Sequence, residues 1–255
     1  MILAVDIGNT NVKIGVFKDN ELLYSGRLSA STHKTGDEYF SALNDMFRLN
    51  GQNISSIKGA IVSSVNPNLN YTFEHMFTSF FRLKPMIVGS GIKTGLHIRY
   101  DNPKEVGADR IVNSVSAYNL YGGPCIVLDC GTATTFNVVS ASGEFLGGCI
   151  GFGLKAGADA LSQKAARLPK VELVRPDKVI GKNTITNMQA GLIYGYVGMV
   201  EYLIRRIKAE RGETPMRVIA TGGLSEIVAA ESGCIDKVDR ALTLKGLNIL
   251  YQLNA

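Results

Sequence analysis

Two turns of this chain combine an acidic residue, a glycine and small polar side chains directly after an apolar run. The first is Asp6-Ile7-Gly8-Asn9-Thr10 and the second is Asp129-Cys130-Gly131-Thr132-Ala133. Glycine lets backbone N–H groups approach an anion closely, so such a turn can face phosphate oxygens. The carboxylate can hold a hydrated cation that bridges those phosphates. One such turn alone is more typical of a plain hairpin, but two in matching contexts favour a phosphate-binding cleft.

The two turns differ in the polar groups that they offer. The first supplies a carboxylate, donors and a cation, from Asp6, Gly8, Asn9, Thr10, Asn11 and Lys13. The second supplies a smaller set, from Asp129, Gly131 and Thr132. A second apolar run follows each turn, over 12–17 and 135–139. This internal repeat predicts two similar domain halves, each presenting an Asp to the same cleft.

A further carboxylate, Asp109, lies in the run Gly107-Ala108-Asp109-Arg110, which opens a predicted helix. By itself, Asp109 is better explained by a favourable interaction with the helix N-terminus. Beside two phosphate-binding turns, it is a candidate general base for a substrate hydroxyl. Arg110 is then a candidate anchor for a substrate carboxylate, and it is otherwise a surface charge.

A third glycine-bearing turn, Thr221-Gly222-Gly223, follows a predicted buried strand and precedes a helical stretch. It is either a further nucleotide contact or an ordinary strand-to-helix turn. The chain contains no Walker A pattern, so the phosphate-binding hypothesis does not rest on P-loop chemistry.

The elements that must position these residues follow from the spacing of apolar side chains. In the first half the pattern predicts strands at 2–7, 12–18, 21–28, 57–65 and 85–88, with helices at 37–49, 71–81 and 108–121. In the second half it predicts strands at 125–129, 134–140, 144–150 and 216–220, with helices at 156–166 and 184–209 and two more helical stretches at the end. This order predicts two α/β domains, each a mixed sheet flanked by helices, over 1–118 and 119–255.

The long helix predicted at 184–209 carries three glycines, Gly191, Gly195 and Gly198, at helical spacing on one side. Glycine in a helix interior costs up to ~1 kcal/mol relative to alanine. The three glycines therefore suggest close approach of another helix, within the chain or across a dimer, although loose packing inside the chain explains them equally well.

Composition excludes several classes of protein. The 255 residues are 45% hydrophobic and 19% charged, with a formal net charge of +5. The basic residues are dispersed and do not alternate with aromatic ones, which favours a solvated surface over a nucleic-acid-binding face. The four cysteines lack metal-ligand spacing, and no apolar run is long enough to span a bilayer. The first residues do not resemble a signal peptide, so we expect a cytoplasmic protein that binds neither membrane nor nucleic acid.

Taken together, these motifs resemble those of the type III pantothenate kinases, of the acetate/sugar kinase–Hsp70–actin superfamily. The resemblance runs nearly end to end. It rests on the two turns, on Tyr100-Asp101-Asn102-Pro103, Gly107-Ala108-Asp109-Arg110, Ala166-Arg167-Leu168-Pro169, Gly181-Lys182-Asn183-Thr184, Thr221-Gly222-Gly223 and Leu242-Thr243-Leu244-Lys245-Gly246-Leu247. It implies two ribonuclease-H-like (actin-like ATPase) domains with a cleft between them.

The resemblance also implies a role for each matching residue. ATP phosphates are expected on residues 6–13, namely Asp6, Ile7, Gly8, Asn9, Thr10, Asn11, Val12 and Lys13, and on Thr132. Pantothenate is expected at Tyr100, Gly107, Ala108, Asp109, Arg110 and Thr184, with Asp109 as the proton acceptor. Asp129 matches a position that binds a monovalent cation, K⁺ or NH₄⁺, and Asp6 is the expected neighbour of Mg²⁺. A homodimer is implied as well, with pantothenate near the subunit interface.

One segment departs from the family pattern. Gly151-Phe152-Gly153 stands where the family commonly has Pro-Gly, and losing the proline removes a constraint on the backbone before Phe152. The expected activity is ATP-dependent phosphorylation of pantothenate to 4′-phosphopantothenate, the first step of coenzyme A biosynthesis. The alternatives are another small-molecule kinase of the superfamily, acting on a sugar or acetate, and a non-catalytic nucleotide-binding regulator.

Overall fold

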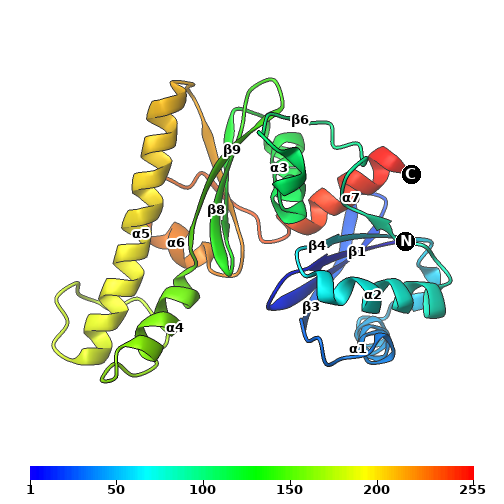
Figure 1. The fold of residues 1–255 in the computed structure, drawn as a ribbon, viewed down its shortest axis with the longest axis horizontal. Coiled ribbons are helices and arrows are strands. Elements are labelled where there is room, and N and C mark those ends of the chain that lie inside the picture. Colours follow the sequence, from blue (N-terminus) through cyan, green and yellow to red (C-terminus); the bar gives the residue numbers. More distant parts are fainter. The chain divides into compact units, whose positions relative to one another are not determined.

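The computed structural model describes residues 1–255, and the chain folds into two compact units. The first unit comprises Met1–Leu120 together with Ala241–Ala255, and the second comprises Tyr121–Arg240. Figure 1 shows that each unit contains a sheet with helices packed on it. None of the helices combines the length and the hydropathy that a bilayer-spanning segment needs.

The sheet of the first unit has five strands in the order β3-β2-β1-β4-β5. The strands β1 (Ile2–Ile7), β2 (Asn11–Lys18) and β3 (Glu21–Ser29) form an antiparallel meander. The strands β4 (Gly59–Ser64) and β5 (Met86–Ile87) then add in parallel beside β1. The sheet is therefore mixed, and its central strand β1 ends at the first acidic turn.

Alternation of side chains along β1 separates the core from the site. Leu3, Val5 and Ile7 point into the core that α1 (Gly36–Leu49) and α2 (Pro67–Met76) cover. Successive side chains of a strand point to opposite faces, so Asp6 lies on the other face. The C-terminal helix α7 (Leu242–Asn254) packs on that face, where Leu244 approaches Gly15.

The helix α3 (Ala108–Tyr121) packs closely against α7. A Cβ added to Gly246 would lie 2.3 Å from the carbonyl oxygen of Val112, so only glycine permits this approach. Short elements complete the first unit: η1 (Ile54–Ser56), the π-helical turn η2 (Phe77–Phe81), β6 (His97–Ile98) and η3 (Pro103–Glu105).

The second unit repeats the strand order of the first. Its strands run β11-β10-β7-β8-β9, with β7 (Cys125–Cys130), β8 (Ala133–Val139) and β9 (Glu144–Phe152) forming the meander. The strands β10 (Arg217–Thr221) and β11 (Lys237–Val238) add in parallel beside β7. The predicted repeat of two mixed α/β sheets is therefore confirmed.

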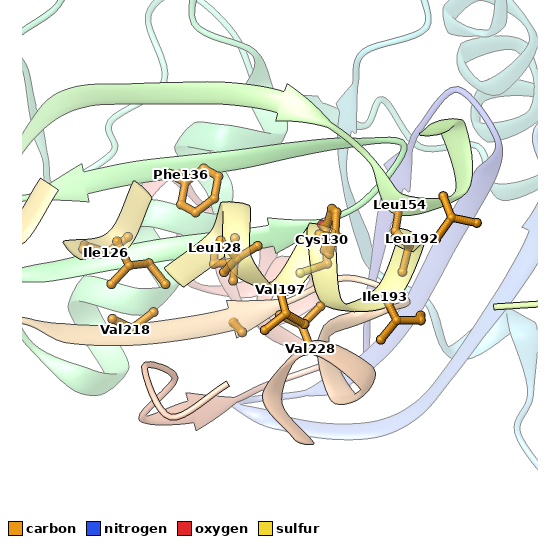
Figure 2. Close-up of a cluster of buried hydrophobic side chains, with 14 of the residues drawn as sticks. Ile126, Leu128, Cys130, Phe136, Leu154, Leu192, Ile193, Val197, Val218 and Val228 are labelled. Atoms are coloured by element: carbon orange, nitrogen blue, oxygen red, sulfur yellow. The ribbon is translucent and has the colours of Figure 1, made fainter. Parts of the chain in front are cut away.

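The core of the second unit lies between its sheet and its helices. Figure 2 shows Ile126, Leu128 and Cys130 of β7 among side chains of the long helix α5 (Thr184–Arg211), including Val197. The helices α4 (Leu154–Lys164) and α6 (Ser225–Glu231) contribute Leu154 and Val228 to the same cluster. Because Leu128 and Cys130 face this core, Asp129 between them faces the opposite side of the sheet.

Some boundaries differ from the sequence-based expectations. The helix α2 begins at Pro67 rather than at 71, because proline at the first helical position suits a helix start. The chain passes from the first unit to the second after Leu120, close to the expected boundary at 118. The expected second domain, 119–255, included the C-terminal helix, whereas α7 packs on β1, β2 and β4 and belongs to the first unit.

Candidate functional site

The turn after β1 is closed by its own backbone. The N–H of Gly8 donates to the carbonyl oxygen of Asn11 at 3.0 Å, and Asn9, Thr10 and Asn11 are exposed. A Cβ at Gly8 would also lie 3.0 Å from that carbonyl oxygen, so glycine fits this turn best. The turn therefore presents an amide, a hydroxyl and a second amide to solvent, which are suitable donors to phosphate oxygens.

Two residues of the expected phosphate-binding segment face inward instead. The side chains of Ile7 and Val12 are fully buried in the core of the first unit. Any contact that Ile7 or Val12 makes with a ligand must therefore come from its backbone.

The Asp6 carboxylate is buried and holds two partners within the first unit. Its Oδ1 accepts a hydrogen bond of 2.6 Å from the Ser63 hydroxyl, and its Oδ2 lies 3.3 Å from the Lys13 ammonium. Lys13 Nζ also donates to Thr243 Oγ1 of α7 at 3.3 Å. Lys13 is directly opposite Asp6 in the β1–β2 ladder and Ser63 is beside Asp6 on β4, so the sheet register itself assembles this group.

These partners define how Asp6 fits a magnesium ion. Mg²⁺ keeps several water ligands in most protein sites and uses only one or two carboxylates. Since both Asp6 oxygens already contact protein groups, this carboxylate suits a contact with the water shell of Mg²⁺ better than direct coordination.

The second turn is held by glycines from two other segments of the second unit. A Cβ on Gly222 would lie 2.6 Å from Asp129 Oδ1, and Gly222 has a φ of +95° that favours glycine. A Cβ on Gly153, just before α4, would lie 2.2 Å from the carbonyl oxygen of Thr132. Glycine at 153 therefore allows the backbone to pack closely against Thr132. Phe152, which precedes it, is exposed.

Asp129 lies beside a buried hydroxyl that has no hydrogen-bond partner. Thr221 pairs with Asp129 in the parallel β7–β10 ladder, so both side chains lie on the same face of the sheet. The Thr221 side chain is completely buried, and its Oγ1 makes no hydrogen bond. Buried hydroxyls normally find a partner, so this oxygen and the Asp129 carboxylate fit a hard cation.

Buried polar contacts fix the strands on either side of the second turn. Thr134 Oγ1 donates to the carbonyl oxygen of Phe152 at 2.9 Å and lies 2.6 Å from Tyr196 Oη.

Burial raises the pKa of the Cys130 thiol to about 12. A thiol with such a pKa is protonated at neutral pH, so Cys130 is a packing residue rather than a nucleophile.

Asp109 lies in the first turn of α3 and is oriented by the backbone. Its Oδ1 accepts a 2.8 Å hydrogen bond from the N–H of Arg110, which also donates to the carbonyl oxygen of Gly107 at 3.1 Å. A Cβ on Gly107 would lie 2.6 Å from the same oxygen. Gly107 therefore leaves room for the Asp109 side chain, and Asp109 is half-buried.

The structure brings Tyr100 and Arg110 together within the first unit. The guanidinium carbon of Arg110 lies 5.8 Å from the centre of the Tyr100 ring, and Arg110 is buried. A guanidinium over an aromatic ring keeps its planar fork oriented. Thr184, the remaining expected pantothenate contact, is the exposed first residue of α5 in the second unit, after its N-cap Asn183.

Ser63 and Thr243 were not among the expected site residues, and Thr221 was expected only as part of a possible nucleotide-binding turn. Ser63 and Thr221 are polar residues near the ends of otherwise apolar strands, at equivalent positions of the two sheets. The repeat of strand and turn was a signal that could have identified both. No local pattern indicates Thr243, because its contact with Lys13 joins opposite ends of the chain.

Solved structures with the same fold cover nearly the whole chain. One is a Campylobacter jejuni protein assigned to the Baf family of transcriptional activators, at 18% identity and a TM-score of 0.63, covering 98% of this chain and 97% of that one. The ethanolamine utilization protein EutJ of Carboxydothermus hydrogenoformans matches at 15% identity with a TM-score of 0.53, and the match covers 97% of this chain and 89% of that one. The inorganic polyphosphate/ATP-glucomannokinase of Arthrobacter sp. strain KM matches at 12% identity with a TM-score of 0.50, and the match covers 98% of both chains. At these identities the likeness establishes the fold alone.

The sequence carries a more specific signal than the fold. Residues 2–206, which include both acidic turns and Asp109, match the sequence model of the type III pantothenate kinases. The match spans most of the chain, and the chain therefore belongs to the type III pantothenate kinase family and is a phosphotransferase.

Proposed function

We propose that this protein phosphorylates pantothenate at its primary hydroxyl with ATP, giving 4′-phosphopantothenate and ADP in the first step of coenzyme A biosynthesis. The observation that carries the proposal is Asp109, which the Arg110 amide orients at the start of α3 in a chain of this family. The carboxylate accepts the hydroxyl proton as the oxygen–phosphorus bond forms and the bond to ADP breaks.

The first acidic turn supports binding of the ATP phosphates. Within residues 6–13, the exposed side chains of Asn9, Thr10 and Asn11 offer donors. In the second unit the exposed Thr132 offers a further hydroxyl and N–H. Lys13 supplies positive charge beside Asp6. Most of the catalysis then comes from positioning and from charge stabilisation.

Two ions complete the proposed chemistry. Mg²⁺ near Asp6 and a monovalent cation, K⁺ or NH₄⁺, at Asp129 supply positive charge that offsets the charge of the phosphates. The residues proposed to hold them are Asp6, through the water shell of Mg²⁺, and Asp129, directly.

Arg110 and Tyr100 support recognition of the pantothenate carboxylate. A buried guanidinium held over an aromatic ring can bind a carboxylate through two parallel hydrogen bonds. Gly107, where a Cβ would lie 2.6 Å from Asp109 Oδ1, keeps the space beside this carboxylate open. Thr184 is proposed as a further contact from the second unit.

The proposal includes a homodimer formed through one face of α5. Gly191, Gly195 and Gly198 are exposed, and a Cβ added to any of them would meet no atom within 4 Å. Close packing within the chain therefore does not explain these glycines. The half-exposed Ile185 and Tyr202 of the same helix add apolar surface for a second copy.

A substrate panel tests the proposed reaction. Purified protein with ATP, Mg²⁺ and K⁺ is supplied with pantothenate, glucose, N-acetylmannosamine or acetate, and ADP release is followed. We expect substantial turnover with pantothenate alone. Turnover with a sugar or acetate would instead identify another kinase of the superfamily, and nucleotide binding without any turnover would indicate a regulator.

A further inference from the structure

The C-terminal helix α7 brings a hydroxyl from the far end of the chain to the first acidic turn. Lys13 Nζ donates to Thr243 Oγ1 at 3.3 Å and lies at the same distance from Asp6 Oδ2. Thr243 and Asp6 are buried, whereas the side chain of Lys13 is 29% exposed. The ammonium therefore contacts two buried oxygens on the protein side, while its side chain remains partly accessible to solvent.

The lengths of these contacts show that the Lys13 ammonium has not closed on the Asp6 carboxylate. Hydrogen bonds between an ammonium and a carboxylate are usually about 2.7–2.9 Å long, whereas the contact between Lys13 and Asp6 measures 3.3 Å. The short contact of Asp6 is the 2.6 Å hydrogen bond from Ser63. Because Thr243 Oγ1 accepts a hydrogen bond from the same ammonium, the ammonium is shared between the hydroxyl and the carboxylate.

The packing of α7 fixes the Thr243 hydroxyl relative to β2. Leu244 lies against Gly15 in the middle of β2, where an added Cβ would be 3.1 Å from the Leu244 Cδ1 atom. One turn further along α7, the side-chain amide of Asn248 donates to the carbonyl oxygen of Asp19, directly after β2, at 3.0 Å. These contacts follow the length of β2, so the position of Thr243 is set by the docking of the whole helix.

We propose that Thr243 is a positioning residue, whose hydroxyl holds the Lys13 ammonium away from Asp6 so that the ammonium can contact a phosphate oxygen of the nucleotide. The role of Lys13 rests on the proposed kinase function, whereas the contacts among the three side chains lie within the first unit. Removing the hydroxyl removes one attraction that opposes the pull of the Asp6 carboxylate. The ammonium then moves toward the carboxylate and away from the phosphate.

The first test compares Thr243→Val, which keeps the shape of threonine without the hydroxyl, with Thr243→Ser, which keeps the hydroxyl. Isothermal titration calorimetry measures the dissociation constant of a non-hydrolysable ATP analogue with Mg²⁺, in the absence of pantothenate. We expect about tenfold weaker binding in Thr243→Val, as for the loss of one hydrogen bond to a charged group, and binding restored in Thr243→Ser. The control is Ser116→Ala in α3, which removes another buried hydroxyl of the first unit and leaves the dissociation constant unchanged.

A double-mutant cycle shows whether the effect of Thr243 acts through Lys13. In a Lys13→Met background, which itself weakens nucleotide binding, Thr243→Val should weaken it no further. Additive losses would instead show that Thr243 acts through packing. The proposal is also overturned by equal dissociation constants in wild type and Thr243→Val, by a loss that Thr243→Ser does not restore, or by a wild type that binds no nucleotide.

A product assay on the same variants separates this proposal from the proposed function. Thr243-dependent nucleotide binding in a protein that makes no 4′-phosphopantothenate would refute only the pantothenate kinase function. An active kinase whose nucleotide affinity does not depend on the Thr243 hydroxyl would refute only the positioning role.

Discussion

Arg110 connects the ionic and aromatic parts of the proposed substrate site. Its guanidinium is buried over the Tyr100 ring, so its orientation is set before any ligand binds. A lysine at this position keeps the charge but loses the planar fork that matches a carboxylate.

Arg110→Lys is therefore expected to weaken pantothenate binding more than it slows turnover. Loss of one charge-assisted hydrogen bond corresponds to roughly 1.5–3 kcal/mol, or about tenfold or more in KM for pantothenate. Steady-state kinetics with pantothenate varied at saturating ATP measure the effect. The neighbouring exposed Arg99→Lys is the control, and equal KM values in both variants would remove Arg110 from the site.

The buried thiols give the free energy of unfolding a defined pH dependence. Burial raises the pKa of both Cys125 and Cys130 to about 12, whereas thiols in the unfolded chain titrate near ~8.5. The folded state therefore binds these protons more tightly. The stabilisation is complete below the unfolded pKa and is lost as the pH rises toward the folded pKa.

Urea unfolding at pH 7, 9 and 10.5 tests this expectation. The free energy of unfolding should fall across the two alkaline points in the wild type. A Cys125→Ala, Cys130→Ala double variant should be less stable at pH 7 because of the lost packing, but should fall less steeply with pH. The same slope in both proteins would show that the thiols do not cause the decline.

At the scale of the elements, the long helix α5 shows where a sequence pattern is ambiguous. Its three glycines were compatible with close packing inside the chain, loose packing or a dimer. The structure leaves them exposed, with no atom within 4 Å of an added Cβ. The ambiguity could not be resolved from spacing, because periodicity gives the face of a helix and not what covers it.

Gly195→Ala tests whether α5 forms a dimer interface, because the added methyl group has different consequences in a monomer and in a dimer. In a monomer the substitution should only stabilise the exposed helix, by up to ~1 kcal/mol. In a dimer with closely packed helices the added methyl group should raise the dimer dissociation constant, which sedimentation velocity over a dilution series measures. Gly233→Ala, at an exposed glycine outside α5, is the control. An unchanged dissociation constant, or a monomeric wild type, would contradict the proposed interface.

The site residues and the helix placement that could not be predicted from the sequence depend on contacts between residues far apart in the chain. Asp6 was identifiable from its turn alone, since strand, acid and glycine are adjacent. Its partner Ser63 depends on the parallel register of β1 and β4, and Thr243 depends on the docking of α7. The apolar pattern of α7 predicts a helix but not which sheet it covers, so its place in the first unit required the structure.

At the scale of the whole molecule, repetition predicted the architecture well. The strands β9-β8-β7-β10-β11 of the second unit follow the order of β3-β2-β1-β4-β5 in the first, and the middle strand of each series ends in an acidic turn. The difference in side chains between the two copies could be predicted only in part from the sequence. Lys13 was visible as a cation, whereas the unpartnered hydroxyl of Thr221 emerged only once β7 and β10 were in register.

The central claim is that Asp109 accepts the proton of a pantothenate hydroxyl during phosphoryl transfer. The most direct measurement is detection of 4′-phosphopantothenate by mass spectrometry, with wild type and Asp109→Asn compared at saturating ATP, Mg²⁺ and K⁺. We predict product in the wild type and a kcat lower by ~10²–10⁴-fold in Asp109→Asn, with an unfolding midpoint that changes little. No product from the wild type, or parallel losses of activity and thermal stability in the variant, would contradict the account.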